Sequence, residues 1–297
     1  MKKIIYIVSF LIIFATGCAS GNNEKKSIKV DWPLYEISYE DSTVGYLLGT
    51  SHIGKPSMYP FPDKLKEAID LSDIFFSEVN YNQAYSESTS NILETFSTNG
   101  PRLDSQLTDV QQQALEKKLK NYDINSSLIE NTTIFGLYIQ MQNKYLDSID
   151  VLNGVDYQLN NYLNSKKQKI ENVGFETVTE QYELIKTELY TFQSANTDWP
   201  DKFPDLSQAK QTNQKMLTAY ISGQLETAMI EINDDPIFSS ENFIVERTQK
   251  WMPKIDDALK NKENIFIAVG SAHLYKTQGI IELLKQKGYT ITKINFD

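Results

Sequence analysis

The sequence contains two histidines, and both stand in the same local pattern. His52 comes three residues after Gly49, and His273 comes three residues after Gly270. In each case an apolar run typical of a β-strand precedes the glycine. A single Gly-x-x-His has little meaning, but two that use every histidine of the chain indicate a shared site. The glycines would allow positive φ, or close approach of another chain segment, where each strand turns toward its histidine.

Carboxylates are predicted at the same edge of the fold as the histidines. Residues 44–79 are typical of a strand, a helix and a second strand, and Glu78 lies near the end of the second strand. A right-handed crossover makes these two strands parallel, so their carboxyl ends point the same way. Open α/β sheets bind their ligands at that edge. Glu176, at the end of the strand-like run 169–176, is expected to join Glu78 there.

These residue types together are suited to metal-assisted hydrolysis. Two neutral imidazoles and a carboxylate are common ligands of Zn²⁺ and of similar divalent ions such as Mn²⁺ or Co²⁺. His52, His273 and Glu78 are therefore the predicted metal ligands. Glu176 or Glu78 would act as the general base toward metal-bound water. Arg247, in a predicted helix over residues 241–259, would bind a substrate carboxylate or stabilise an oxyanion.

Each of these residues also has a purely structural explanation. A histidine or a glutamate at a strand end is often simply hydrogen-bonded, and Glu176 could cap a helix that begins near residue 178. An arginine on a helix is usually a surface or ion-pair residue. Ser51 and Ser271 lie beside the histidines. The sequence lacks Gly-x-Ser-x-Gly, however, and no aspartate is obviously placed to orient either imidazole, so a serine nucleophile is disfavoured.

The fold class is predicted to be α/β, with a mixed central sheet built from both ends of the chain. A hairpin over residues 34–48 makes a purely parallel sheet improbable, and helices fill the middle of the chain, at about residues 105–240. Residues 80–102 are expected to form a long polar loop with a helical piece near residues 92–96. A second polar loop is expected over residues 191–207, and a helix broken near Gly279 over residues 274–287.

The N-terminus is predicted to be a lipoprotein signal peptide over residues 1–17. A basic start is followed by an apolar stretch that is too short to span a bilayer. Small residues then precede Cys18, the sole cysteine, and this pattern resembles a bacterial lipobox. The resemblance implies cleavage before Cys18 and a diacylglyceryl anchor on its sulfur; the alternative is an ordinary secretory signal. Residues 18–30 are the predicted tether and residues 31–297 the domain, held at the extracytoplasmic face of the cell membrane.

The charge of the chain disfavours one class of partner. It carries 29 lysines and arginines against 39 aspartates and glutamates, with a net charge of −10. Binding of nucleic acid normally requires a basic surface that displaces phosphate counterions. We therefore expect no nucleic-acid partner.

Several motifs resemble those of the TraB/GumN family, which includes the animal Tiki proteins. The resemblance extends over roughly residues 34–295. It is carried by Leu-Gly-Thr-Ser-His-Ile-Gly at 48–54, Ile-Phe-Phe-Ser-Glu-Val at 74–79, Gly-Val-Asp at 154–156, Gly-Phe-Glu-Thr at 174–177 with Gln181, Glu-Arg-Thr at 246–248 and Ala-Val-Gly-Ser-Ala-His-Leu at 268–274.

The resemblance implies an active centre made of His52, His273, Glu78 and Arg247, and a metal-dependent peptidase that acts on peptides near the cell surface. Thr248 departs from the family pattern, in which an asparagine usually follows the arginine, so the hydrogen bonding around Arg247 is open to question. Two alternatives remain. One is a lipoprotein that binds a peptide or a metal-bearing ligand without turnover, as in the shutdown of pheromone signalling. The other is a metal-free hydrolase with His52 or His273 as the base.

Overall fold

The computed structural model describes the chain from residue 27 to residue 296, apart from residues 85, 147, 167–169, 227–240 and 262–263. The predicted signal peptide, Cys18 and most of the predicted tether therefore lie outside the described residues.

Six strands form one mixed sheet, as expected from the sequence. They are β1 (Leu34–Tyr39), β2 (Ser42–Thr50), β3 (Ile74–Val79), β4 (Glu171–Glu176), β5 (Ile265–Gly270) and β6 (Thr290–Lys293). Their order across the sheet is β4-β3-β5-β2-β1-β6. The strands β4, β3, β5 and β2 are parallel to one another, whereas β1 is antiparallel to both β2 and β6. Strand β5, from the C-terminal part of the chain, thus lies between β2 and β3, so both ends of the chain contribute to the centre of the sheet.

The predicted hairpin is formed by β1 and β2. Glu40 and Asp41 connect the strands, and both have left-handed φ values, 47° and 62°. Two-residue hairpin loops favour this conformation because its twist matches that of the flanking strands. The hairpin brings Gly49 and Thr50 to the end of β2, next to β5.

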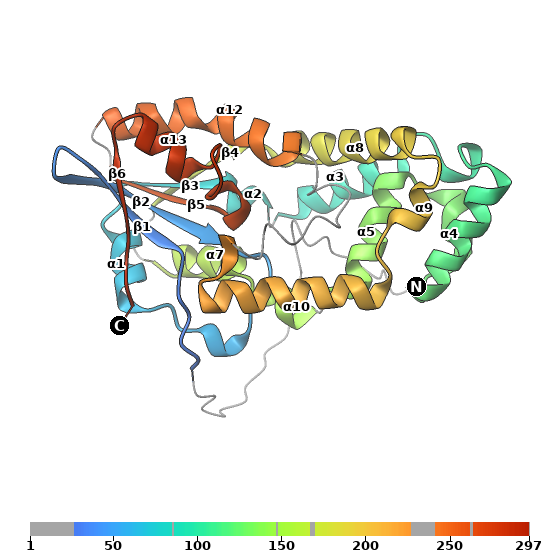
Figure 1. Cartoon of the computed structure of the whole chain (residues 1–297), viewed down its shortest axis with the longest axis horizontal. Coiled ribbons are helices and arrows are strands. Elements are labelled where there is room, and N and C mark those ends of the chain that lie inside the picture. Colours follow the sequence, from blue (N-terminus) through green and yellow to red (C-terminus); the bar gives the residue numbers. More distant parts are fainter. Residues whose placement is uncertain are drawn as a thin grey trace.

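Helices cover both faces of the sheet (Figure 1). One face is covered by α1 (Asp63–Asp70), α7 (Val155–Ser165) and α10 (Leu206–Ser222), and the other by α12 (Glu241–Lys260) and α13 (Ile280–Gln286). Successive side chains along a strand point to opposite faces of the sheet, so the strands contribute residues to both cores. Phe75 and Phe266, for example, stack at 5.2 Å between ring centroids on the first face. Ile265 and Ile267 point to the second face.

A helical lobe lies beyond the carboxyl ends of the parallel strands (Figure 1). It contains α3 (Glu87–Thr98), α4 (Asp109–Asn121), α5 (Ile134–Tyr145), α8 (Val178–Ala195) and α9 (Trp199–Lys202). Its core is separate from the two cores of the sheet, and Phe135, Tyr182 and Trp199 are among its fully buried residues. The shorter helical segments are α2 (Tyr81–Ala84), α6 (Ser148–Leu152), and 3₁₀ turns at Pro56–Met58, Leu103–Ser105, Ser126–Asn131 and Ser271–His273.

Helix α12 connects the two parts of the molecule. Phe243, near its start, belongs to the core of the helical lobe, whereas Trp251 and Ile255 belong to the core of the sheet. Arg247 lies between these anchors, so the helix holds it at the junction of the lobe and the sheet.

Two predictions about local structure are wrong, and a third is only partly right. The expected loop over residues 80–102 contains α2 and the full helix α3, because Ile92, Leu93 and Phe96 recur at helical spacing and pack on the lobe core. The loop over residues 191–207 is largely helical, since α8 continues to Ala195 and α9 follows it. The helix predicted over residues 274–287 with a break near Gly279 is formed only after that break: α13 begins at Ile280, with Gly279 as its N-cap, and residues 274–279 are not helical.

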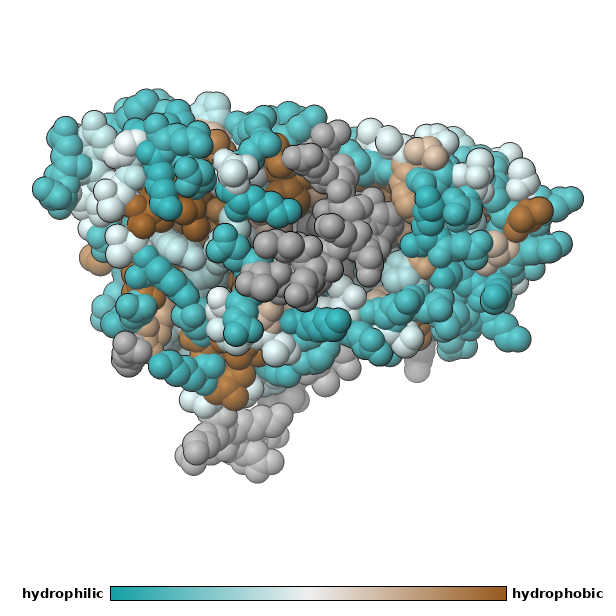
Figure 2. Space-filling view, viewed as in Figure 1, coloured by the Kyte–Doolittle hydropathy of each residue, from teal (hydrophilic) through white to brown (hydrophobic). Residues whose placement is uncertain are grey.

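The face drawn in Figure 2 is mostly hydrophilic, and its apolar areas are separate. Large exposed hydrophobic side chains among the described residues are Ile28, Tyr39, Leu71 and Val110. Within the described ranges, no helix has both the length and the apolar character needed to cross a membrane.

Candidate active site

The carboxyl ends of four parallel strands meet at one edge of the sheet. Thr50 of β2 is paired with Gly270 of β5, and Val79 of β3 is paired with Glu176 of β4. Glu78 and Glu176 lie at the ends of their strands, and His52 and His273 follow theirs. These predicted site residues therefore lie on the edge where open α/β sheets bind their ligands.

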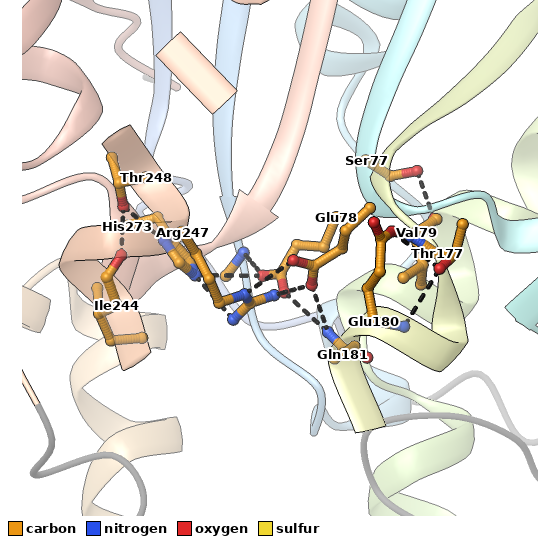
Figure 3. Close-up of polar contacts among 12 residues, drawn as sticks. Ser77, Glu78, Val79, Thr177, Glu180, Gln181, Ile244, Arg247, Thr248 and His273 are labelled. Atoms are coloured by element: carbon orange, nitrogen blue, oxygen red, sulfur yellow. Dashed lines mark hydrogen bonds and ion pairs between the residues drawn. The ribbon is translucent and has the colours of Figure 1, made fainter. Parts of the chain in front are cut away.

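Arg247 is at the centre of this edge (Figure 3). Its Nη2 donates to Glu78 Oε2 at 2.5 Å and also to Glu176 Oε1. Its Nε donates to Glu176 Oε2 at 3.2 Å, and its Nη1 is 3.3 Å from His273 Nε2. The side chain is only 2% exposed. Arg247 is therefore not a surface residue, but the alternative explanation as an ion-pair residue is confirmed. One guanidinium contacts three predicted site residues.

Aromatic rings enclose the guanidinium and the imidazole. The Cζ atom of Arg247 is 4.9 Å from the ring centroids of both Phe243 and Trp251. Trp251 also lies 4.3 Å from the His273 ring. Both rings are within cation–π distance of the guanidinium, so cation–π attraction adds to the ion pairs.

The protonation of His273 follows from its two partners. The Thr248 hydroxyl donates to the Ile244 carbonyl at 2.7 Å, so it must accept from His273 Nδ1, which is also 2.7 Å away. This assigns the proton of the neutral ring to Nδ1 and leaves Nε2 as the acceptor toward Arg247. Burial, together with the nearby positive charge of Arg247, lowers the pKa of His273 to about 3. Thr248 thus provides a hydrogen bond to the site although it departs from the family pattern.

The two glutamates have opposite pKa shifts. Burial raises the pKa of Glu78, but the positive charge of Arg247 and a hydrogen bond from the Gly270 N–H at 2.7 Å contribute to a net decrease to about 2. For Glu176, burial outweighs the effect of Arg247 and the pKa is raised. Gln181 Nε2 donates to both carboxylates, at 3.4 and 3.2 Å. Glu78 is therefore a fixed anion, and Glu176 is the carboxyl that accepts a proton more readily.

His52 has a different partner from His273. Its Nδ1 is 2.9 Å from Asp156 Oδ2, and the Tyr81 hydroxyl donates to Asp156 Oδ1 at 3.1 Å. Its side chain is 33% exposed. Burial alone would lower the pKa of His52, but the contact with the negative charge of Asp156 and the more distant charge of Glu78 produce a net increase.

The two glycines of the histidine motifs act through close approach and not through positive φ. A Cβ on Gly270 would lie 2.9 Å from Glu78 Oε1, and φ at Gly270 is −48°. A Cβ on Gly49 would lie 2.8 Å from Ser271 Oγ and 2.9 Å from Leu274 Cδ2. Gly270 in particular leaves the space in which the Glu78 carboxylate reaches the backbone N–H.

The structural alternatives can now be compared with the geometry. Helix α8 is capped by Thr177, whose hydroxyl accepts from the Glu180 N–H, so the explanation of Glu176 as the helix cap is wrong. Ser51 and Ser271 donate their hydroxyl protons to the backbone carbonyls of Ile53 and Thr50. Neither geometry is that of a serine activated by an imidazole.

Three residues that were not predicted as site residues contact the site. Asp156 orients His52, Gln181 connects the two glutamates, and Thr248 orients His273. The statement that no aspartate is placed to orient an imidazole is therefore wrong. Asp156 and Gln181 lie in motifs that support the family resemblance, whereas the only sign for Thr248 is its departure from the family pattern.

The side chains as they stand fit a guanidinium better than a metal ion. Within the described residues, no group of three or more His, Cys, Asp or Glu is arranged to hold a metal. Glu78 Oε2 and His273 Nε2, which were predicted to face a metal, face Arg247. The predicted metal ligands are of types that can bind a divalent ion. In this structure, however, the guanidinium of Arg247 lies between Glu78 and His273.

A comparison of the sequence with models of protein families agrees with the resemblance indicated by the motifs. The sequence model of the TraB/PrgY/gumN family matches residues 33–293. The chain therefore belongs to the TraB/PrgY/gumN family, as its motifs indicated. No curated protein and no solved structure matches the chain.

Proposed function

We propose that this protein is a hydrolase of peptides, with its reaction centre at the edge formed by His52, Glu78, Glu176 and Arg247. The observation that supports this proposal most strongly is the set of opposed pKa shifts among groups gathered at one strand edge. Groups whose environments move their pKa values apart are typical of acid–base chemistry.

The residues suggest a division of roles. His52 is the most exposed of the four, and its raised pKa suits a group that exchanges a proton with water or substrate. Glu176, whose pKa is also raised, would take the proton released by the attacking water and pass it to the leaving amine. Arg247 would stabilise the negative charge that develops on the carbonyl oxygen. Glu78 would remain ionised and hold Arg247 in place.

The test is incubation of the full chain with a peptide library, followed by mass spectrometry. We expect new fragments with the unaltered chain, and a loss of at least about 10²-fold in His52→Gln and Glu176→Gln, in line with the usual contribution of a proton-transfer group. Glu183→Gln on the exposed side of α8 is the matched control, because that carboxylate pairs only with Lys186 among the contacts described for it. Fragments formed equally by all variants would contradict the proposal.

A divalent ion at His52, His273 and Glu78 is a separate proposal. The family resemblance supports it, and the position of Arg247 opposes it. Elemental analysis of the purified full chain tests it directly. About one ion per chain, absent from His52→Ala and His273→Ala, would support a metal site that forms when Arg247 moves away. The same metal content in all three proteins would contradict it.

Binding without turnover is the alternative function, and one observation favours it. Arg247 and His273 are each 2% exposed, so much of the site is inaccessible to a large substrate in this conformation. In the library experiment, an intact peptide retained by the protein, with no new fragments, would support this alternative over hydrolysis.

We further propose that the protein is anchored to the extracytoplasmic face of the cell membrane through a lipid on Cys18. The support is the lipobox-like sequence before the sole cysteine. Metabolic labelling with palmitate should label the unaltered chain but not Cys18→Ser. A Cys18→Ser chain that is labelled and membrane-bound to the same degree would contradict the anchor.

A further inference from the structure

We propose that Asp156 is a positioning residue that holds the His52 imidazole with its proton on Nδ1, and that Tyr81 in turn orients Asp156. The role assigned to Asp156 rests on the proposed function, in which His52 exchanges the proton. The geometry itself does not depend on any activity.

The side-chain contacts form a chain of three groups. His52 Nδ1 meets one oxygen of Asp156 at 2.9 Å, and the Tyr81 hydroxyl donates to the other at 3.1 Å. Asp156 and Tyr81 are both buried, at 9% and 5% exposure, whereas His52 is partly exposed. A buried carboxylate fixed by a second donor has little freedom to turn away, so it selects one orientation of the ring it contacts.

Main-chain hydrogen bonds also hold Asp156 close to His52. The Val155 N–H donates to the Ser51 carbonyl at 2.7 Å, and the Gly54 N–H donates to the Asp150 carbonyl at 2.9 Å. A Cβ on Gly154 would lie 2.2 Å from the His52 carbonyl oxygen, so only glycine permits this approach. The start of α7 is thus docked directly on the loop that carries His52. Asp156, in the first turn of α7, is held at a defined position relative to the imidazole.

The chemical consequence concerns the second ring nitrogen. A neutral histidine without a partner favours the proton on Nε2. An acceptor at Nδ1 reverses this preference and makes Nε2 the basic nitrogen, as in catalytic and metal-binding histidines that donate to a carboxylate. Asp156 would therefore determine which nitrogen of His52 can take a proton or bind a cation.

The test uses the fact that the chain has only two histidines. The full chain, purified without a histidine tag and labelled with ¹⁵N-histidine, should show two imidazole spin systems. His52→Gln removes one and assigns both. At a pH high enough for both rings to be neutral, we expect Nδ1 of His52 to have the ¹⁵N chemical shift of a protonated nitrogen. Its Nε2 should have the shift of an unprotonated nitrogen.

In Asp156→Ala these two shifts should exchange between the nitrogens of His52, while the His273 signals stay unchanged. If the alanine variant does not fold, Asp156→Leu can replace it, because leucine fills the space but offers no hydrogen-bond acceptor to His52. Tyr81→Phe should shift the His52 signals part of the way. Thr248→Val is the matched control, because it should alter the His273 signals and not those of His52. His52 signals that are the same with and without Asp156 would overturn the proposal, whatever the peptide assay shows.

Discussion

His52 and His273 follow the same sequence pattern on neighbouring parallel strands, yet their surroundings are opposite. His52 is one-third exposed, contacts the carboxylate of Asp156, and has a raised pKa. His273 is 2% exposed, contacts the guanidinium of Arg247, and has a pKa lowered to about 3. The shared pattern places each imidazole at the sheet edge. Its chemistry is determined by partners from α7 and α12, which lie far away in the sequence.

The comparison suggests a division of labour. His52 can exchange a proton near neutral pH, whereas His273 stays neutral and is part of the ion-pair network around Arg247.

Replacement of Arg247 by methionine should have the largest effect on stability. It leaves two buried carboxylates and a buried imidazole without their cation, and breaking a buried pair costs about 3–5 kcal/mol. Urea unfolding measures the loss. Lys166→Met is the control, because Lys166 pairs with Asp70 at the surface and should cost less than about 1 kcal/mol. Equal losses in the two variants would show that the Arg247 cluster is not a stabilising network.

Acidification should destabilise the protein through His273. Because its folded-state pKa of about 3 lies below the ordinary value of 6.5, the unfolded chain binds this proton first. The stability that depends on neutral His273 is fully present above pH 6.5 and is lost as the pH falls toward 3. Between these limits the unaltered chain should lose up to about 1.4 kcal/mol per pH unit more than His273→Gln. Parallel stability curves for the two proteins would contradict the assignment.

Removal of the Thr248 hydroxyl should have a moderate effect. Thr248→Val leaves the buried His273 Nδ1–H without an acceptor, which costs about 1–3 kcal/mol. Thr248→Asn restores an acceptor and should cost less. Chemical unfolding of both variants tests this order, and an asparagine variant that is less stable than the valine variant would be inconsistent with the hydrogen bond assigned here.

Replacement of His52 by glutamine should have the smallest effect on stability, about 1 kcal/mol or less, because the ring is partly exposed. The sign of its pH dependence is opposite to that of His273. A raised folded-state pKa stabilises the folded protein below pH 6.5, and this contribution is lost as the pH rises through the folded-state pKa. The difference in stability between the unaltered chain and His52→Gln should therefore shrink on going from pH 6 to alkaline pH. A difference that grows instead would show that Asp156 does not stabilise the charged ring.

The sequence predicted the elements better than the contacts between them. The paired Gly-x-x-His motifs and the strand–helix–strand pattern were enough to place His52, His273, Glu78 and Glu176 at one edge of a mixed sheet. They could not show that β5 lies between β2 and β3, because strand order depends on long-range pairing. The polar sequence of α3 predicts a loop, but packing on the lobe stabilises it as a helix.

The partners of the site residues were also beyond the sequence patterns. Asp156 lies 104 positions after His52, and no spacing rule connects them. Arg247 was expected to face a substrate, but in the structure its Nη2 and Nε bind Glu78 and Glu176. The opposite pKa shifts of Glu78 and Glu176 identify Glu78 as the fixed anion. The sequence could not show this, because the shifts depend on burial and on the position of the Arg247 guanidinium.

The most direct test of the central claim is an NMR titration of the two imidazoles in the full chain. With only two histidines present, each ring gives its own curve, and His52→Gln assigns them. The structure predicts that His52 titrates with a midpoint above 6.5, while His273 stays neutral down to the lowest pH at which the protein remains folded. Two curves with a common midpoint near 6.5 would contradict the claim that the same motif carries two opposite electrostatic environments.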